Sequence, residues 1–147
     1  RDFTVIIDYA HTPDGLEKIC GALRECKAGR LVTVFGCGGD RDKTKRPKMG
    51  AAAAALSDYL VVTSDNPRSE EPQAIIDDIL VGLEGGKAPY TVVVNRVEAI
   101  HWAIRHAKPG DTILLAGKGH ETYQVLHDGI IHLDEREIVA EYLAAGH

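Results

Sequence analysis

Short runs of branched apolar residues alternate along the 147-residue chain with longer segments of mixed polarity. The short runs are rich in Val, Ile and Leu and have the length of strands, whereas the mixed segments have the length of helices. Strands are predicted at residues 4–7, 31–35, 59–63, 91–94 and 112–116, with a more polar one at 123–127. Helices are predicted at residues 13–26, 45–56, 72–83, 96–106 and 134–143.

This order of elements predicts the fold class. Continuous apolar strands separated by helices are typical of a parallel sheet that is covered on both faces. Crossovers between parallel strands are right-handed, so we predict an α/β fold: a Rossmann-like, doubly wound, mostly parallel sheet with helices on both faces. Residues 123–127 and 130–133 flank Asp128-Gly129, a strong turn signal, and predict a small hairpin near the C-terminal end.

Local signals agree with the predicted helices. Thr12 before Pro13 is typical of an N-cap followed by proline in the first turn, and Pro72 suits the start of a later helix. Gly85-Gly86 is expected to stop that helix. The five alanines at residues 51–55 predict a helix face that lies close against the sheet.

Length, charge and cysteine count narrow the class of protein. The length suits one domain, and a net charge of −5 argues against a nucleic-acid partner, which needs a basic face. No apolar run approaches the roughly 20 residues of a membrane span, so no membrane partner is expected. Three cysteines without a close pair indicate a reducing compartment, and we expect a cytoplasmic protein. The first residue is Arg rather than Met, which hints at a fragment.

Polar, glycine-rich segments directly follow four of the predicted strands. They are residues 8–11, 36–41, 64–68 and 117–121. Ligands of open parallel sheets bind beyond the carboxyl ends of the strands, so these segments predict a binding site at one edge. The plain alternative is that they are only turns.

Two nucleotide-binding motifs fail on inspection. Gly36-x-Gly38 begins like a dinucleotide fingerprint, but Arg41 stands where the third glycine belongs. Lys43-Thr44 lacks the glycine that precedes the lysine of a phosphate-binding loop, because Asp42 is there instead. The chain is therefore not predicted to be a self-sufficient P-loop ATPase.

The residue types in these segments suit a ligand that carries both charges. Arg41 and Arg68 offer planar forks that bind carboxylates with two hydrogen bonds. Asn66 can donate to a carboxylate or accept from an ammonium group, and Glu121 can accept from an ammonium group. Gly117 can present an unshielded backbone carbonyl.

Each of these residues also has an ordinary alternative. Arg41 can pair with the neighbouring Asp40 or Asp42 on the surface, and Glu121 can cap the following segment. Pro67 restricts the backbone and stiffens the loop around it. The seven histidines are scattered without metal-ligand spacing, so no metal site is predicted, and Cys37 is interpreted as a packing residue.

Taken together, the four segments resemble a known family. They read Asp8-Tyr9-Ala10-His11-Thr12-Pro13-Asp14, Phe35-Gly36-Cys37-Gly38-Gly39-Asp40-Arg41-Asp42, Thr63-Ser64-Asp65-Asn66-Pro67-Arg68 and Gly117-Lys118-Gly119-His120-Glu121. In this order they resemble the C-terminal domain of the Mur ligases, from Val5 to about Leu143. The closest resemblance is to the members that add diaminopimelate during peptidoglycan synthesis.

The resemblance implies that residues 1–147 form one domain of a longer enzyme. In the family, an N-terminal domain binds the UDP-linked substrate, and a central ATPase domain holds ATP and Mg²⁺; both would be absent from this chain. The family reaction uses ATP to activate the carboxylate of a UDP-N-acetylmuramoyl dipeptide as an acyl phosphate. The amine of an incoming amino acid then attacks it to form an amide.

The resemblance also implies roles for individual residues, none of them catalytic. The implied pocket for meso-diaminopimelate contains Arg41, Asp65, Asn66, Pro67, Arg68, Gly117 and Glu121. The loop that faces the nucleotide contains Asp8, Tyr9 and His11. Diaminopimelate is lysine with an added distal carboxylate, so a guanidinium at position 68 suits it and argues against lysine as the substrate.

Three other functions stay open at this level. A stand-alone amino-acid-binding module would keep the charged pocket and need no nucleotide loop. A related Mur or folylpolyglutamate-type ligase would use another amino acid. A dinucleotide-binding domain is disfavoured by Arg41 in the glycine motif.

Overall fold

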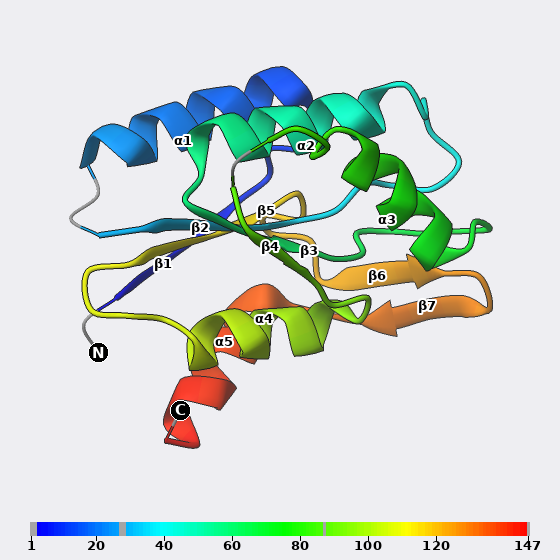
Figure 1. Cartoon of the computed structure of the whole chain (residues 1–147). Coiled ribbons are helices and arrows are strands. Elements are labelled where there is room, and N and C mark those ends of the chain that lie inside the picture. Colours follow the sequence, from blue (N-terminus) through cyan, green and yellow to red (C-terminus); the bar gives the residue numbers. More distant parts are fainter. Residues whose placement is uncertain (1–2, 27–28, 87, 147) are drawn as a thin grey trace.

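The computed structural model describes residues 3–26, 29–86 and 88–146 as a three-layer α/β structure (Figure 1). The central layer is a five-stranded sheet in the order β1-β5-β2-β3-β4, in which every neighbouring pair is parallel. Its strands are β1 (Thr4–Asp8), β2 (Leu31–Phe35), β3 (Tyr59–Val62), β4 (Tyr90–Val92) and β5 (Thr112–Ala116). The predicted doubly wound parallel sheet is confirmed.

Helices cover both faces of this sheet. One face carries α1 (Pro13–Cys26), α2 (Lys45–Leu56) and α3 (Pro72–Val81), and the other carries α4 (Arg96–Arg105) and α5 (Glu135–Ala144) (Figure 1). The first three crossovers carry the chain from β1 past the position of β5 to β2, then to β3 and β4, and α4 returns it on the opposite face to β5. The loops after the neighbouring strands β2 and β5 therefore leave toward different faces, which opens a crevice between them.

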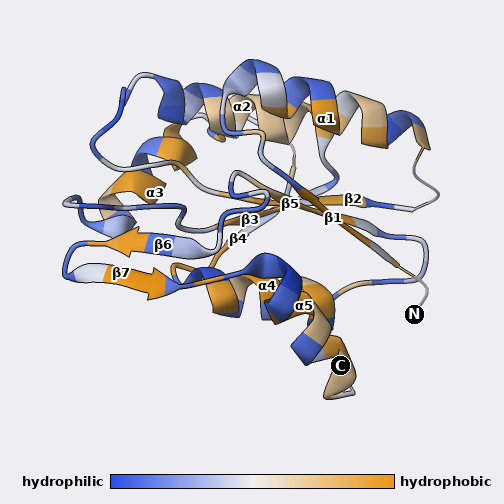
Figure 2. Ribbon diagram, turned by 180° about the vertical axis from the view of Figure 1, so that it is seen from behind, coloured by the Kyte–Doolittle hydropathy of each residue, from blue (hydrophilic) through white to orange (hydrophobic). Residues whose placement is uncertain are grey.

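Alternating strand side chains divide the interior into two cores. On β2, Leu31 and Phe35 belong to the core under α1, α2 and α3, whereas Val32 and Val34 belong to the core over α4 and α5. The apolar sides of the helices accordingly face the sheet (Figure 2). The inner strands β5, β2 and β3 are largely buried because helices cover them on both faces, whereas the edge strands β1 and β4 are only partly buried.

The helix starts follow the signals in the sequence. The hydroxyl of Thr12 accepts a hydrogen bond from the backbone N–H of Gly15 (3.0 Å), as an N-cap does. Pro72 lies in the first turn of α3, where its missing N–H is harmless. That helix ends at Val81, two residues before the predicted end, in a run of turns. Helix ends fray, so differences of this size at several boundaries carry no further meaning.

The alanine-rich face of α2 covers less of the interior than predicted. Ala52 and Ala53 are buried, but Ala51 and Ala55 are exposed. The helix lies between α1 and α3, against which most of its contacts are made. Only part of the alanine run therefore faces inward.

A separate antiparallel hairpin lies beside the carboxyl end of the sheet. The hairpin itself is confirmed, but its turn lies one residue earlier than predicted: His127 and Asp128 form the turn, and Gly129 already pairs with Leu126. Its strands are β6 (Tyr123–Leu126) and β7 (Gly129–His132) (Figure 1). The hairpin is bonded to the loop after β3, because the backbone N–H of Arg68 donates to the carbonyl of Val125 (3.0 Å) and the amide of Gln124 donates to the carbonyl of Asp65 (2.7 Å). It therefore supports the loop after β3. Among the described residues, no helix has the length and apolar character needed to cross a membrane.

Candidate functional site

A cavity of about 410 Å³ lies at the carboxyl end of the parallel strands, in the size range of small-molecule sites. All four predicted polar segments contribute to its lining. From these segments the lining residues are Tyr9, His11, Gly36, Cys37, Gly38, Arg41, Asp65, Asn66, Arg68, Gly117 and Glu121. Thr12, Asp42, Lys45, Arg46 and Met49 complete it. Segments far apart in the sequence thus meet at one site, as the sheet topology requires.

Eight of the ten predicted site residues line this cavity, and Asp8 and Pro67 do not. The carboxylate of Asp8 accepts a hydrogen bond from the backbone N–H of Ala10 (2.9 Å), so it stabilises the turn after β1. Pro67 is buried behind the loop, and its carbonyl accepts from the N–H of Glu70 (3.0 Å). Both residues shape the loops that carry the lining side chains.

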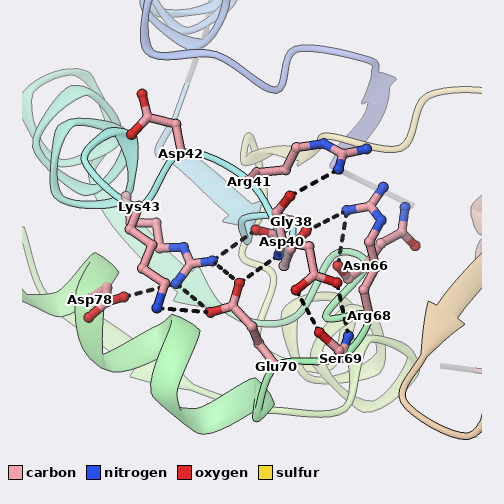
Figure 3. A network of polar contacts seen from close by, with 12 residues as sticks. Gly38, Asp40, Arg41, Asp42, Lys43, Asn66, Arg68, Ser69, Glu70 and Asp78 are labelled. Atoms are coloured by element: carbon pink, nitrogen blue, oxygen red, sulfur yellow. Dashed lines mark hydrogen bonds and ion pairs between the residues drawn. The ribbon is translucent and has the colours of Figure 1, made fainter.

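Arg68 is held in place by its own loop and the one beside it. Its Nη1 donates to the carbonyl oxygens of Gly39 (3.0 Å) and Asn66 (3.4 Å) (Figure 3). Its backbone is in the left-handed region, with φ of 52°, which is unusual for a bulky residue. The bond from its N–H to Val125 helps to hold this conformation, so the guanidinium is fixed at the cavity.

The loops after β2 and β3 lie so close that glycine is required between them. A Cβ on Gly39 would lie 1.8 Å from the carbonyl oxygen of Pro67, and one on Gly36 would lie 2.2 Å from that of Thr63. The N–H of Gly39 donates to the carbonyl of Asn66 (2.7 Å). These glycines therefore allow backbone packing that joins the two halves of the site, in addition to turning the chain.

Arg41 is less constrained than Arg68. It is exposed, and its Nη1 donates to the backbone carbonyl of Asp40 (3.1 Å) (Figure 3). The carboxylate of Asp40 accepts from the hydroxyl of Ser69 (2.6 Å), which lowers the pKa of Asp40, and that of Asp42 accepts from the hydroxyl of Thr44 (2.6 Å). The two acids that were alternative partners of Arg41 are therefore bonded elsewhere.

Arg46 forms a charged network at the rim that the sequence did not indicate. Its buried guanidinium bonds to Glu70 (2.8 Å), to Asp78 (2.9 Å) and to the carbonyl of Gly38 (3.2 Å) (Figure 3). The hydrogen bonds from Arg46 and from the N–H of Asp40 lower the pKa of Glu70 to about 2. This network ties α2 and the loop after β2 to Glu70, which precedes α3, and to Asp78 within α3.

Lys118 is a second residue that the sequence did not single out. Its side chain is fully buried, and its ammonium donates to Oδ1 of Asn66 (2.8 Å) and to the carbonyl of Tyr123 (3.0 Å). The same nitrogen lies 3.2 Å from Asp65 Oδ1 and 3.6 Å from Glu121 Oε1. Three lining residues thus share one buried cation, and a lysine between two glycines in a loop gave no sign of this.

Arg96 lies beneath the same edge and was also missed. Its Nη1 donates to the carbonyl of Ser64 (2.9 Å), its Nη2 to that of Ala116 (2.8 Å), and its Nε to Glu135 (2.8 Å). Both side chains of the ion pair are fully buried. Because β2 separates β3 from β5, Arg96 bridges the ends of two strands that do not touch and fixes the spacing of the loops that follow them.

Aromatic rings form one side of the entrance. Tyr9 is 48% exposed, and its ring lies 4.8 Å from that of His11 and 6.2 Å from that of His120, measured between centroids. The two histidine rings are tilted by 61° and 34° relative to that of Tyr9, so the exposed Tyr9 ring is the surface offered to a stacking ligand. Cys37, deeper in the cavity, has its pKa raised to about 12 by burial, which suits the predicted packing role rather than nucleophilic attack.

The charges of the lining suit a small zwitterion. Arg41 and Arg68 supply cations, and Asp65 and Glu121 supply carboxylates. Guanidinium groups bind carboxylates and carboxylates bind ammonium groups, so the lining offers partners for both charges of a zwitterion. In the part of the chain that the structure describes, no cluster of three or more His, Cys, Asp or Glu side chains suits a metal ion.

Comparison with known proteins identifies the family. Residues 1–119 match the family model described as Mur ligase, glutamate ligase domain. The chain is 60% identical over 142 residues to UDP-N-acetylmuramoyl-L-alanyl-D-glutamate--2,6-diaminopimelate ligase 1 of Clostridium acetobutylicum, covering 97% of the chain and 29% of that protein. It is 56% identical over 144 residues to the corresponding ligase of Caldanaerobacter subterraneus subsp. tengcongensis, covering 98% of the chain and 30% of the relative.

A solved structure gives the same result. A structure of UDP-N-acetylmuramoyl-L-alanyl-D-glutamate--2,6-diaminopimelate ligase superposes with a TM-score of 0.92 at 37% identity, over 99% of this chain and 30% of that one. The chain therefore spans less than a third of the length of these relatives. The resemblance seen in the sequence is confirmed: the chain belongs to the Mur ligase family and corresponds to its C-terminal domain.

Proposed function

We propose that this chain is the amino-acid-binding domain of a cytoplasmic, ATP-dependent ligase that adds meso-diaminopimelate to UDP-N-acetylmuramoyl-L-alanyl-D-glutamate. The names of the relatives support this reaction. The observation that carries the proposal is the convergence of Arg41, Arg68 and Glu121, from three different loops, on one cavity.

The cavity suits one end of diaminopimelate, which carries an ammonium and a carboxylate at each end. We assign the carboxylate of the bound end to Arg68 and Arg41, together with the amide nitrogen of Asn66. The ammonium of that end is assigned to Glu121 and Asp65. The other end then extends out of the cavity with its amine available for reaction.

In this proposal the domain contributes positioning. The free amine attacks the carbonyl carbon of the activated dipeptide, so a C–N bond forms, the C–O bond to phosphate breaks, phosphate leaves and the amine loses a proton. Holding that amine close to the acyl phosphate removes much of the entropic barrier. Charge-assisted bonds from a fixed Arg68 set the direction of the bound end.

The nucleotide is proposed to bind mainly outside this chain, together with Mg²⁺, in the central domain of the complete ligase. Tyr9 and His11 expose rings at the entrance of the cavity, where the ATP-binding domain would close over them. Asp8 would act indirectly, through the turn that carries them.

The test is Arg68→Ala in the complete ligase, measured by phosphate release. Loss of a charge-assisted pair costs about 1.5–3 kcal/mol, so the KM for diaminopimelate should rise at least roughly tenfold. The KM for ATP should stay unchanged. Arg68→Lys should not restore the wild-type value, because lysine lacks the planar fork.

The matched control is Arg105→Ala, which removes an exposed arginine from the last turn of α4. It should leave both constants unchanged. If Arg68→Ala leaves the KM for diaminopimelate at its wild-type value, Arg68 does not bind the substrate and the proposed pocket is wrong. If diaminopimelate is not used and another amino acid is, the ligase belongs to a different branch of the family.

A further inference from the structure

We propose that Lys118 is a positioning residue that sets the specificity of the cavity for a ligand ammonium group. It does so by holding one oxygen of Asp65 and one of Glu121, and by fixing the amide of Asn66. This inference rests on the proposed function, because it concerns how the same cavity distinguishes its amino acid.

The position of Lys118 indicates an indirect role. Its side chain is fully buried and is not part of the cavity lining, so it acts on a ligand only through its neighbours. Those neighbours, Asp65, Asn66 and Glu121, all line the cavity. A fully buried ammonium is costly unless it is paired and hydrogen-bonded, so its partners are tightly coupled to it.

The charges of this cluster do not balance within it. One ammonium faces two carboxylates, which leaves a net charge of −1. Asp65 Oδ1 and Glu121 Oε1, the oxygens that face Lys118, are buried and accept no hydrogen bond in the described structure. The second oxygen of each carboxylate is therefore the one available to the cavity. One negative charge, divided over two fixed oxygens, matches one ligand ammonium.

The same lysine fixes the direction of the Asn66 amide. Oδ1 of Asn66 accepts from Lys118 (2.8 Å) and from the backbone N–H of Val125 (3.0 Å). Two donors on the inner side determine which way the amide is turned. Its nitrogen then remains as the donor toward the cavity, where it suits the carboxylate of the ligand. Lys118 thus orients groups for both charges of the bound end.

Removal of the Lys118 ammonium should affect recognition of the ligand ammonium and of the ligand carboxylate unequally. Without Lys118, the two carboxylates repel each other and lose their anchor, so the oxygens that would receive a ligand ammonium no longer have a fixed direction. The carboxylate of the ligand keeps Arg68, which is held by Gly39 and Val125 independently of Lys118. Recognition of the ammonium should therefore suffer more than recognition of the carboxylate.

The experiment compares two amino acids in the complete ligase: meso-diaminopimelate, and L-2-aminopimelate, which has the same two carboxylates and lacks the distal amine. The ratio of their kcat/KM values measures recognition of that amine. In the wild type the ratio should be at least roughly tenfold in favour of diaminopimelate. Lys118→Met should reduce it to about threefold or less through the KM for diaminopimelate, with the KM for ATP unchanged.

The control is Lys108→Met, an exposed lysine before β5 at the opposite end of the sheet, which should keep the wild-type ratio. A purely structural role for Lys118 would weaken both amino acids equally. An unchanged ratio in Lys118→Met therefore overturns the inference, even if the overall rate falls.

A second measurement covers the case in which Lys118→Met does not fold. In the wild-type chain, the ¹⁵N resonance of the Lys118 ammonium should move on titration with diaminopimelate and move less than half as far with L-2-aminopimelate at saturation. Equal shifts, or no shift with a ligand that binds, overturn the inference. If neither amino acid binds or reacts in the wild type, the proposed function itself fails, which is a different outcome.

Discussion

Two fully buried cations lie under the same edge of the sheet, and they are built differently. Arg96 is matched by one carboxylate, Glu135, and by two backbone carbonyls, so its charge is balanced and enclosed. Lys118 is surrounded by two carboxylates that also line the cavity, so its cluster carries excess negative charge and opens toward a ligand. Arg96 and Lys118 are therefore equally buried, but the partners of Arg96 are enclosed in the interior and those of Lys118 border the cavity.

This difference distinguishes a buried charge that stabilises the fold from one that prepares a binding site. A balanced pair sealed in the interior can fix only the spacing of the strands that it bridges. An unbalanced cluster at a cavity can be completed by a molecule of opposite charge. Arg46 is intermediate, because it is buried and bonds two carboxylates, yet Asp78 is 44% exposed and the network borders the solvent.

The largest effect should come from breaking the enclosed pair. Arg96→Met leaves Glu135 as an unpaired buried charge and frees two strand-end carbonyls, so the free energy of unfolding should fall by about 3–5 kcal/mol. Urea denaturation of the chain measures this. Arg96→Met combined with Glu135→Leu should recover a large part of the loss, since no charge is then left buried. A loss below about 1 kcal/mol in the single variant would show that the pair is not needed for stability.

An intermediate effect should follow acidification of the Arg46 network. The pKa of Glu70 is about 2 in the folded chain, below its ordinary value of 4.5. A lowered folded-state pKa contributes stability above the unfolded value, and this contribution is lost as the pH falls through the folded value. The stability difference between wild type and Glu70→Gln should therefore be complete above pH 4.5 and shrink toward pH 2. A difference that stays constant over this range would contradict the assignment.

The smallest effect on stability is expected at Arg41, an exposed cation of the cavity. Arg41→Ala should change the free energy of unfolding by less than about 0.5 kcal/mol. In the complete ligase it should raise the KM for diaminopimelate by roughly fivefold or less, because an exposed pair is worth about 0.2–1 kcal/mol. An effect as large as that of Arg68→Ala would mean that Arg41 is ordered by the ligand.

The fold was predictable because its signals are local. Branched apolar runs, Pro72 and the Asp-Gly signal of the hairpin each act within a few residues, although the turn itself lies at His127-Asp128. The parallel topology then places the four polar loops at one edge. The convergence of Arg41, Arg68 and Glu121 followed from that topology.

The buried cations were not predictable in the same way. Arg96 and Glu135 are 39 residues apart, and Lys118 and Asn66 are 52 apart, so their pairing appears only when the chain is folded. Composition indicates a surface position for such residues, because lysine and arginine are rarely buried. The support of Asn66 by the small hairpin was missed for the same reason.

The left-handed backbone at Arg68 limits which side chains can replace this arginine at the cavity. A β-branched side chain at this position would meet steric strain whatever ligand occupied the cavity. Asn and Gly tolerate this conformation best, so replacements by them should add the least backbone strain. The backbone conformation at position 68 therefore restricts substitutions there independently of the charge that the new side chain carries.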